Sequence, residues 1–393
     1  MRSYQDLFRT PEFTPLFLSS ALQGAGQTVG GLAIGTLVYA ATDSPLLSAV
    51  SMFTPQLAQV LGATTLLSAA DRIPPRAALA GIALAYGLGT AVLALPGLPV
   101  RAVFPVILVL GLIASLGGGV RWGLLNEILA KDGYLLGRSV FNMMSGLMQV
   151  VGFATGGVLV AVLSPRTALL LSALLYLLAA LGARLGLAAR PPRVSGRPSV
   201  AATWRTNALL WSSRPRRLTY LGLWLPNGLV VGCESLFVSY DPGSAGTLFA
   251  AAALGMLLGD VTVGRLVPPA LRPRLATPLL LLLAGPYLLF ALHPATPVAA
   301  VAAALASLGF GASLVQQERL MALTPDKLSG HALGLHSSGM LTMQGVAAAL
   351  AGSVAQLASP ATAMTVMAGA SAVVTVTLAA AGRRPRVPEP QPA

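Results

Sequence analysis

The sequence predicts an all-α integral membrane protein in which twelve transmembrane helices form two six-helix bundles related by pseudo-symmetry. Three observations support this prediction. Charged residues make up only 9% of the 393-residue chain, the hydrophobic set makes up 55%, and the mean hydropathy is +0.76, values that a soluble domain of this length does not normally show. Apolar stretches of about 20 residues recur along the chain. Two sequence patterns of the first half return in the second half.

Twelve apolar windows are each close to the length that a bilayer-spanning helix needs. Helices are expected because hydrocarbon offers backbone amides no partner, and because the period-2 alternation of a membrane barrel is absent. The windows cover residues 15–40, 46–69, 77–96, 103–127, 140–163, 167–187, 218–239, 246–263, 276–293, 297–317, 332–357 and 362–381.

The repeated patterns divide the chain into two similar halves laid head to tail. Arg76 follows Asp71 by five residues, and Arg265 follows Asp260 by the same spacing, 189 residues further on. A second pattern repeats after 193 residues and aligns Gly137 with Gly330 and Ser145 with Ser338. Both offsets are close to half the chain length, as expected for a parallel repeat, and such repeats in an apolar chain are typical of transporters.

The composition divides the chain into four segments. Residues 1–187 and 218–382 are the predicted six-helix bundles, 188–217 is a basic linker, and 383–393 is a charged, proline-rich tail expected to be disordered. Within the linker, four residues recur at helical spacing, which favours a short surface helix with its tryptophans in the headgroup layer; a flexible tether is the alternative. These residues are Val200, Trp204, Ala208 and Trp211.

The distribution of basic residues predicts the orientation. If both termini are cytoplasmic, only Arg101 and Arg166 among the 25 Lys and Arg face outside, as the positive-inside rule requires of a protein of the plasma or inner membrane. The formal charge of +13 is then spread over short cytoplasmic segments. It does not indicate binding to nucleic acid, since no nucleic-acid motif is visible. Anionic lipid headgroups are the expected counterions.

Several other kinds of site are not indicated. Cys233 is the only cysteine, and the three histidines, His293, His331 and His336, have no ligand cluster around them, so we expect no disulfide, metal site or cofactor. No GxSxG turn, P-loop or HExxH is present, which argues against an enzyme and against an ATP-driven pump. The expected partners are a small-molecule substrate, protons and membrane lipids, and the expected state is a monomer.

Twelve spans in two halves, a basic central loop and a charged element between the second and third spans together resemble the major facilitator superfamily. That element is similar to the family pattern GxLADRxGRR, whose charged positions are occupied by Asp71, Arg72 and Arg76. Leu67 and Pro74 replace its two glycines. In the second half of the chain, the stretch that contains Gly259, Asp260, Gly264 and Arg265 resembles the degenerate second copy of this family pattern.

The fifth span is glycine-rich in a way that resembles the antiporters of this family, although it lacks the proline of their motif. Its glycines are Gly146, Gly152, Gly156 and Gly157. The resemblance implies export.

Acidic and basic residues at one depth predict a pair of gating latches. Asp71 and Arg76 lie where a helix leaves the membrane, and Glu127 lies at the cytoplasmic end of the fourth span. Such pairs can break and reform as the halves rock. The counterpart latch consists of Asp260, Arg265 and Glu318. The alternative is that these are solvated headgroup-level charges, each worth about 0–1 kcal/mol.

Polar residues near the midplane are the candidates for a substrate cavity, which the resemblance places among the first, fourth, seventh and tenth helices. Buried amides in hydrocarbon either bridge helices or face water and substrate. The candidates are Gln23 and Gln27, which share a helix face, with Gln149, Asn227 and Gln344. Arg121 either reaches the inner interface as a snorkelling residue or contacts a substrate carboxylate.

Glu234 is the candidate for proton coupling. It is the only carboxylate placed well inside the apolar thickness, about 22 Å from the inner end of the seventh span. An intramembrane carboxyl group of this kind can take up and release protons. The alternative is a glutamate at the outer rim that contacts water near Asp241.

These features predict a secondary active transporter that works by alternating access and exports a small amphipathic organic compound in exchange for protons. Uptake of a small nutrient by proton symport is the alternative within this class. A lipid-modifying membrane enzyme would need interfacial carboxylate or His clusters, which are absent. A receptor or scaffold would need neither paired gating charges nor midplane amides.

Overall fold

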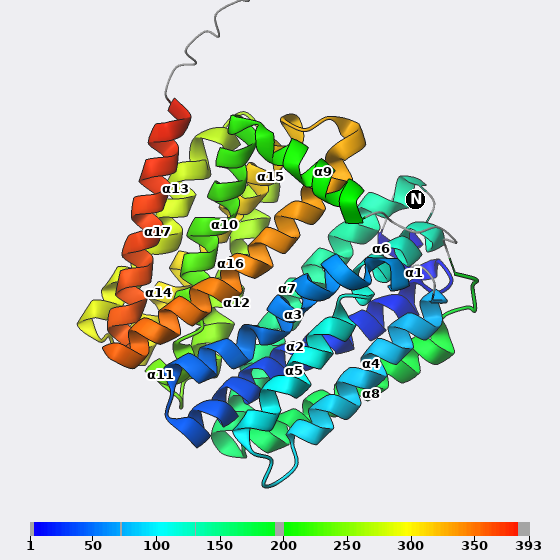
Figure 1. Ribbon diagram of the computed structural model, residues 1–393, viewed down its shortest axis with the longest axis horizontal. Helices are drawn as coiled ribbons and strands as arrows, with labels where there is room; N and C mark the ends of the chain where they lie inside the picture. The colour runs from blue at the N-terminus through cyan, green and yellow to red at the C-terminus, as the bar shows by residue number, and fades with distance from the viewer. Residues whose placement is uncertain (1–3, 71–72, 130, 193–199, 384–393) are drawn as a thin grey trace, which may run out of the picture.

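The structure, a computed structural model, describes residues 4–70, 73–129, 131–192 and 200–383. Every regular element in these ranges is a helix. Figure 1 shows the helices in two groups, one from the blue-to-teal first half of the chain and one from the green-to-red second half. Asp71, Arg72 and residues 384–393, about which the sequence makes predictions, lie outside the described residues.

The first half contains eight helices. A short helix, α1, precedes the long α2, and the fourth apolar window is divided between α5 and α6. The helices are α1 Tyr4–Arg9, α2 Phe13–Thr42, α3 Pro45–Ala70, α4 Pro75–Leu93, α5 Val100–Ala114, α6 Gly117–Ile128, α7 Lys131–Val162 and α8 Pro165–Gly186.

The linker contributes one helix, and the second half follows it. The elements are α9 Val200–Ser212, α10 Arg214–Glu234, α11 Phe237–Tyr240, α12 Ala245–Val261, η1 Thr262–Leu266, α13 Arg272–Ala284, η2 Gly285–Leu292, α14 Thr296–Leu308, η3 Gly309–Gly311, α15 Ala312–Ala322, η4 Asp326–Leu328, α16 Ser329–Leu357 and α17 Pro360–Arg383.

The prediction of an all-helical protein with many membrane-spanning segments is confirmed. Within the described residues, nine helical segments are long and apolar enough to cross a membrane. The remaining predicted windows correspond to α2, α3 and the broken α5–α6 segment. The exact number of twelve spans therefore stays a prediction.

The two halves share a helix start that the sequence analysis did not find. The stretch Ser-Pro-x-Thr-Ala opens both α8 and α17, 195 residues apart. In α8 the Ser164 hydroxyl accepts a hydrogen bond from the Thr167 amide at 3.1 Å, and in α17 the Ser359 hydroxyl accepts one from the Thr362 amide at the same distance. This is the N-cap arrangement that satisfies an otherwise unpaired amide of the first turn.

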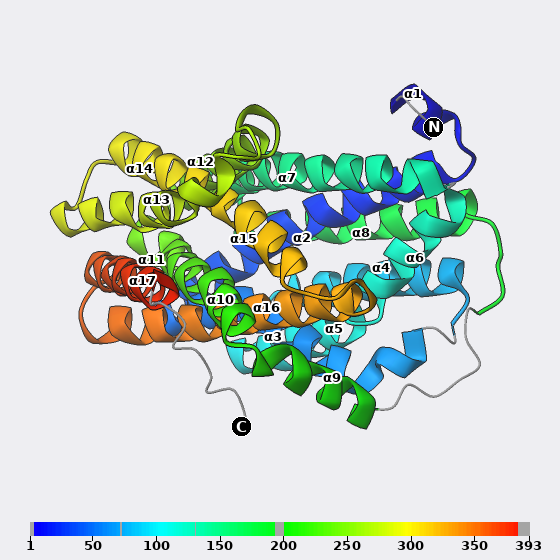
Figure 2. The same ribbon diagram turned by 90° about the horizontal axis from the view of Figure 1, so that it is seen from above.

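The halves meet along two helix pairs, α3 with α16 and α7 with α12 (Figure 2). We call the end of the molecule at which α8 ends and α10 begins the linker end, and the opposite end the far end. Near the far end, Ser44 donates a hydrogen bond to Gln356 at 2.8 Å, and Phe153 stacks on Phe249 with ring centroids 4.7 Å apart. The helices of the two groups diverge towards the linker end in Figure 1.

A glycine–glycine contact brings α7 and α12 close together at the far end. A Cβ atom added to Gly157 would lie 2.5 Å from the Cα of Gly246, a distance that backbone atoms cannot tolerate. Gly157 of the predicted glycine-rich fifth span therefore serves close packing against α12, and Gly152 and Gly156 pack on α2, in agreement with the use of small residues between membrane helices.

Replacing Gly157 with alanine is expected to destabilise the protein by about 1–3 kcal/mol, because the added methyl group overpacks this contact. Thermal unfolding in detergent measures the effect. Gly369→Ala is the matched control, since nothing lies within 4 Å of a Cβ atom at that position and alanine favours helix more than glycine does. Equal melting temperatures for Gly157→Ala and the control would contradict the expected overpacking.

Candidate functional site

The first half encloses a polar cavity of about 150 Å³ between α2, α3, α4, α6 and α8. Its walls combine amide, phenol and guanidinium groups with a few apolar side chains. The polar lining residues are Gln23, Gln27, Gln56, Gln59, Tyr86, Arg121 and Tyr176. Among the residues that the structure describes, no carboxylate lines this cavity, and Arg121 is the one charged side chain in its wall.

Arg121 provides that charge from the second piece of the broken fourth helix. Its Nη2 donates a hydrogen bond to Oε1 of Gln23 at 2.8 Å, and its buried Nε has no hydrogen-bond partner among the described residues. A buried charge is costly unless it is paired, so an arginine in this position favours any anionic group that enters the cavity. The guanidinium fork also suits a planar oxyanion.

Three of the predicted cavity residues meet here, and four lining residues were missed. The sequence analysis named Gln23, Gln27 and Arg121, which all line the cavity. It overlooked Gln56 and Gln59 of α3, although their three-residue spacing places them on one helix face. It also overlooked two tyrosines of α4 and α8 that look like ordinary interior aromatics. These are Tyr86 and Tyr176, whose ring centroids are 5.0 Å apart.

The other predicted amides lie elsewhere. Asn227 is buried in the second half, where its Nδ2 donates to the Ser313 hydroxyl at 3.4 Å and its Oδ1 has no partner among the described residues. Gln149 and Gln344 are half-buried on α7 and α16, the helices that face the opposite half. These three amides are therefore separate from the cavity of the first half.

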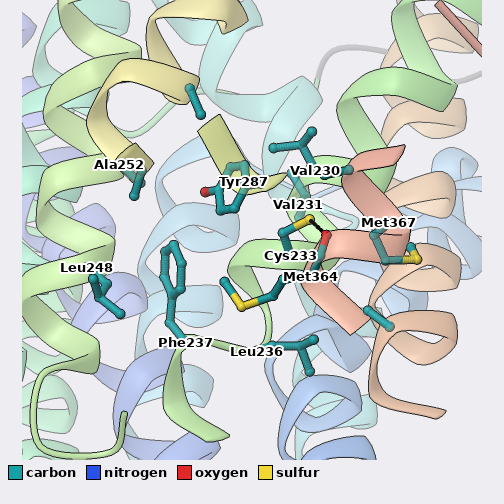
Figure 3. Close-up of a cluster of buried hydrophobic side chains, with 14 of the residues drawn as sticks. Val230, Val231, Cys233, Leu236, Phe237, Leu248, Ala252, Tyr287, Met364 and Met367 are labelled. Carbon is teal, nitrogen blue, oxygen red and sulfur yellow. Dashed lines mark hydrogen bonds between the residues drawn. The ribbon is translucent and has the colours of Figure 1, made fainter. Parts of the chain in front are cut away.

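Glu234 lies at the end of α10, inside the second half. Its side chain is buried, and Oε1 accepts hydrogen bonds from the Tyr287 hydroxyl at 3.5 Å and the Ser307 hydroxyl at 3.4 Å. No Arg or Lys of the described residues forms an ion pair with it. Figure 3 shows the buried apolar cluster that contains the adjacent Cys233, which donates to the carbonyl oxygen of Met364 at 3.3 Å. Glu234 is thus a buried residue of the second half, and its depth in the membrane stays a prediction.

An ion-pair network joins three segments of the first half at the linker end. Arg190 pairs with Glu12 through Nη1 at 2.6 Å and with Glu127 through Nε at 3.7 Å. The backbone amide of Ala188 also donates to Glu12 at 2.8 Å. Nη1 of Arg76, the basic residue of the first predicted latch, lies 3.5 Å from the carbonyl oxygen of Leu187, to which it donates. The network thus ties the linker to the start of α2 and the end of α6.

The second half has a different ion pair in the corresponding region. Arg272 binds Glu318 at 2.5 Å and donates to the carbonyl oxygens of Gly264 and Val267. Arg265 lies 3.7 Å from the sulfur of Met143, across the contact between the halves. Asp260 is exposed at the end of α12, and no ion pair to it occurs in the described part of the chain.

The Glu12–Arg190 pair is expected to make stability depend on pH. The hydrogen bond from Arg190 lowers the pKa of Glu12 below its usual 4.5, so the pair stabilises the fold above pH 4.5 and loses this effect as the pH falls through the lowered pKa. At neutral pH, Glu12→Gln should unfold more readily than the parent by at most about 1 kcal/mol, since the pair is partly exposed.

Chemical unfolding at pH 7 and pH 3 measures this pH dependence. The difference between Glu12→Gln and the parent should shrink at pH 3, where protonation has already weakened the pair in the parent. A difference that stays constant or grows on acidification would contradict the assignment. Arg166→Gln, at the far end of the protein, controls for the loss of a charge.

The linker helix α9 attaches to the second half through an aromatic stack. The ring of Trp211 is 5.6 Å from that of Trp224 on α10, with 9° between the planes. Trp204, two helical turns earlier, is 65% exposed. One tryptophan of the predicted stripe thus docks the helix, and the other faces outward.

The described residues contain no group of three or more His, Cys, Asp and Glu side chains that could hold a metal ion. The polar groups brought together in the cavity suit the binding of a small polar or anionic molecule.

Solved structures of transporters have the same fold. A nucleoside transporter, NupG, matches with a TM-score of 0.75 and 14% identity over 93% of this chain and 98% of its own. A POT family transporter in complex with 5-aminolevulinic acid matches with a TM-score of 0.74 and 11% identity over 93% and 95% of the two chains. A peptide transporter crystallised with sulfate matches with a TM-score of 0.70 and 14% identity over 97% and 98%.

The chain has the major facilitator fold. The resemblance stated from the charged element and the two halves is confirmed at the level of the fold. No protein-family model and no curated protein sequence matches the chain. At 11–14% identity, these neighbours identify the architecture, and both the activity and the substrate have to be argued from this chain's own residues.

Proposed function

We propose that this protein is a secondary active transporter that carries a small organic compound across the plasma or inner membrane by alternating access. In this proposal, twelve spans form two halves that rock about their shared contacts. The major facilitator fold and the limited contact between the halves, along α3–α16 and α7–α12, support it. Both termini are cytoplasmic, and the working unit is a monomer.

The cavity around Arg121 is the observation on which the substrate proposal depends. A guanidinium group with an unpaired Nε and no lining carboxylate favours a compound that carries an acidic group. Four glutamine side chains supply further donors and acceptors that can orient it. The compound is thus an amphipathic organic acid or zwitterion, with its acidic group at Arg121.

We further propose that transport is coupled to protons through Glu234. An unpaired carboxyl group within the membrane is the kind of side chain that proton-coupled transporters use. Tyr287 and Ser307 hold it by hydrogen bonds to a single oxygen. The charged residues at the linker end, Asp71, Arg72, Arg76 and Glu127 with Asp260, Arg265 and Glu318, act in this scheme as gates that break and reform between states.

Export is the proposed direction, and uptake by proton symport is the alternative. The resemblance to antiporters in the fifth span supports export, whereas Gly157 is accounted for by its packing against Gly246. An enzyme is not favoured, since the neighbours in structure are transporters and the cavity lacks an acid–base pair.

Reconstitution in proteoliposomes tests the proposal. A panel of radiolabelled organic acids, zwitterions and their uncharged amides is offered with and without an imposed proton gradient. Gradient-driven accumulation of at least one acid, and not of its amide, is the expected result. Reversing the gradient distinguishes export from symport. A protein that folds and inserts but moves none of the acids under either gradient would contradict the proposal.

A further inference from the structure

The second half contains a larger cavity, of about 450 Å³, that lies apart from the candidate substrate site. It lies between α10, α13, α15 and α17, and no residue of the first half lines it. The helices that face the other half, α12 and α16, do not contribute either.

The sequence repeat identifies the equivalent place in the first half. Three features align the halves. The Ser-Pro-x-Thr-Ala starts of α8 and α17 are 195 residues apart, and so are Gly117 and Ala312, at which α6 and α15 begin. The Pro-Arg dipeptides at Pro75 and Pro273 are 198 residues apart. At these offsets, Gln316 corresponds to Arg121 and Leu280 to Ile82, both of which line the polar cavity of the first half. Six other lining residues correspond to apolar residues of the first half. The pairs are Ala276 with Ala78, Thr277 with Leu79, Val315 with Val120, Arg319 with Leu124, Leu378 with Ala183, and Gly382 with Leu187.

The first half fills this place with its own side chains. All six counterparts belong to one buried apolar cluster, which also contains Leu7 of α1 and Phe13 at the start of α2. In the second half, the helix before the first span is α9, which packs by Trp211 on Trp224, away from the cavity. The second half therefore keeps open, on the side of these six residues, a space that its repeat partner closes with apolar groups.

Arginines lie in or directly beside the sequence segments that line this cavity. Arg319 lines it, and the exposed Arg217 and Arg274 are chain neighbours of the lining residues Leu218 and Pro273. The one lining carboxylate, Glu318, is paired with Arg272. Apolar walls beneath a cluster of arginines at a helix-bundle end match the two parts of an anionic phospholipid, whose phosphate binds guanidinium and whose acyl chain requires an apolar space.

We infer that this cavity binds an anionic phospholipid, with an acyl chain among α10, α13, α15 and α17 and the phosphate at Arg217, Arg274 and Arg319. The lipid replaces the apolar side chains that close the same place in the first half. This site is independent of the proposed transport activity, because it shares no residue with the Arg121 cavity or with Glu234.

Native mass spectrometry of the full-length protein in detergent tests the inference, with dioleoylphosphatidylglycerol and dioleoylphosphatidylcholine as probes. The parent should bind one phosphatidylglycerol at least about tenfold more tightly than phosphatidylcholine. Arg217→Gln, Arg274→Gln and Arg319→Gln combined should remove this preference. Arg166→Gln, an exposed arginine at the far end, should retain it.

A cavity-filling variant tests the acyl-chain part separately. Thr277→Leu with Gly382→Leu installs the two leucines found at the equivalent places of the first half, and a Cβ atom at Gly382 has nothing within 4 Å. This variant should melt no lower than the parent and bind phosphatidylglycerol at least about tenfold more weakly. If it does not fold, the arginine variants alone decide the question.

Three results would overturn the inference. Equal affinity of the parent for the two lipids would contradict the proposed recognition of an anionic headgroup. Undiminished binding of phosphatidylglycerol by the triple arginine variant would contradict the proposed position of the phosphate. Inorganic phosphate that competes with phosphatidylglycerol equally well in the parent and in the folded cavity-filling variant would indicate a small-anion site without a chain. None of these measurements requires transport, so they stand whether or not the transport proposal holds.

Discussion

Replacing Arg121 with glutamine is expected to lower substrate affinity by roughly 10- to 150-fold, because it removes a charge-assisted hydrogen bond worth about 1.5–3 kcal/mol. The effect should appear as a raised KM for the acidic compound identified by the transport panel. Glutamine is shorter than arginine but keeps a polar amide in the cavity, so the fold should be retained. Binding measured by scintillation proximity, which needs no gradient, provides the affinity directly.

Two further variants make the Arg121 experiment specific. Arg121→Lys keeps the charge but loses the planar fork, so it should show an intermediate affinity. Arg184→Gln removes an exposed arginine of the same half and should bind substrate as the parent does. If the amide analogue of the substrate loses affinity in Arg121→Gln to the same extent as the acid, the guanidinium does not recognise an acidic group.

Replacing Glu234 with glutamine is expected to abolish accumulation driven by a proton gradient while exchange of labelled for unlabelled substrate continues. The carboxyl group is the only titratable part that the change removes, and an amide can keep the hydrogen bonds from Tyr287 and Ser307 to its oxygen. Accumulation and exchange, measured side by side in proteoliposomes, separate coupling from substrate movement.

Asp43→Asn controls for the loss of one negative charge. Asp43 is exposed in the turn after α2, and its positive φ of 50° is a conformation that asparagine tolerates. This variant should accumulate substrate normally. A Glu234→Gln protein that still concentrates substrate against its gradient, with the same pH dependence as the parent, would remove Glu234 from the coupling mechanism.

The fold was largely predictable because a bilayer imposes simple rules on sequence. Apolar length and the spacing of charges located the helices, and Asp71 and Asp260 revealed the repeat. The break between Ala114 and Gly117 was not predicted, because α5 and α6 together form one continuous apolar window. Hydropathy reports on burial in the membrane and contains no information on where a helix bends.

The site was only partly predictable, because polarity along one helix does not reveal what faces it. Gln23 and Gln27 could be found by their shared face. Their contact with Arg121 depends on the orientation of α6 after the break in the fourth apolar window, which the sequence does not give. Glu234 was identified by depth alone, and its partners Tyr287 and Ser307 come from helices more than 50 residues away in sequence.

The contact between Gly157 and Gly246 is a close backbone approach near one end of the long α7 helix, a place where two helices can pivot against each other. With no side chains between them, the two backbones can tilt against each other there but cannot slide apart without losing their packing. The α7 helix continues for about 21 Å from Gly157 to Met143, where Arg265 lies beside it. In the proposed rocking motion, a small change of angle at the glycines would be enlarged into a displacement of several ångströms at the opposite end, which is the scale on which a water molecule or a small solute gains entry.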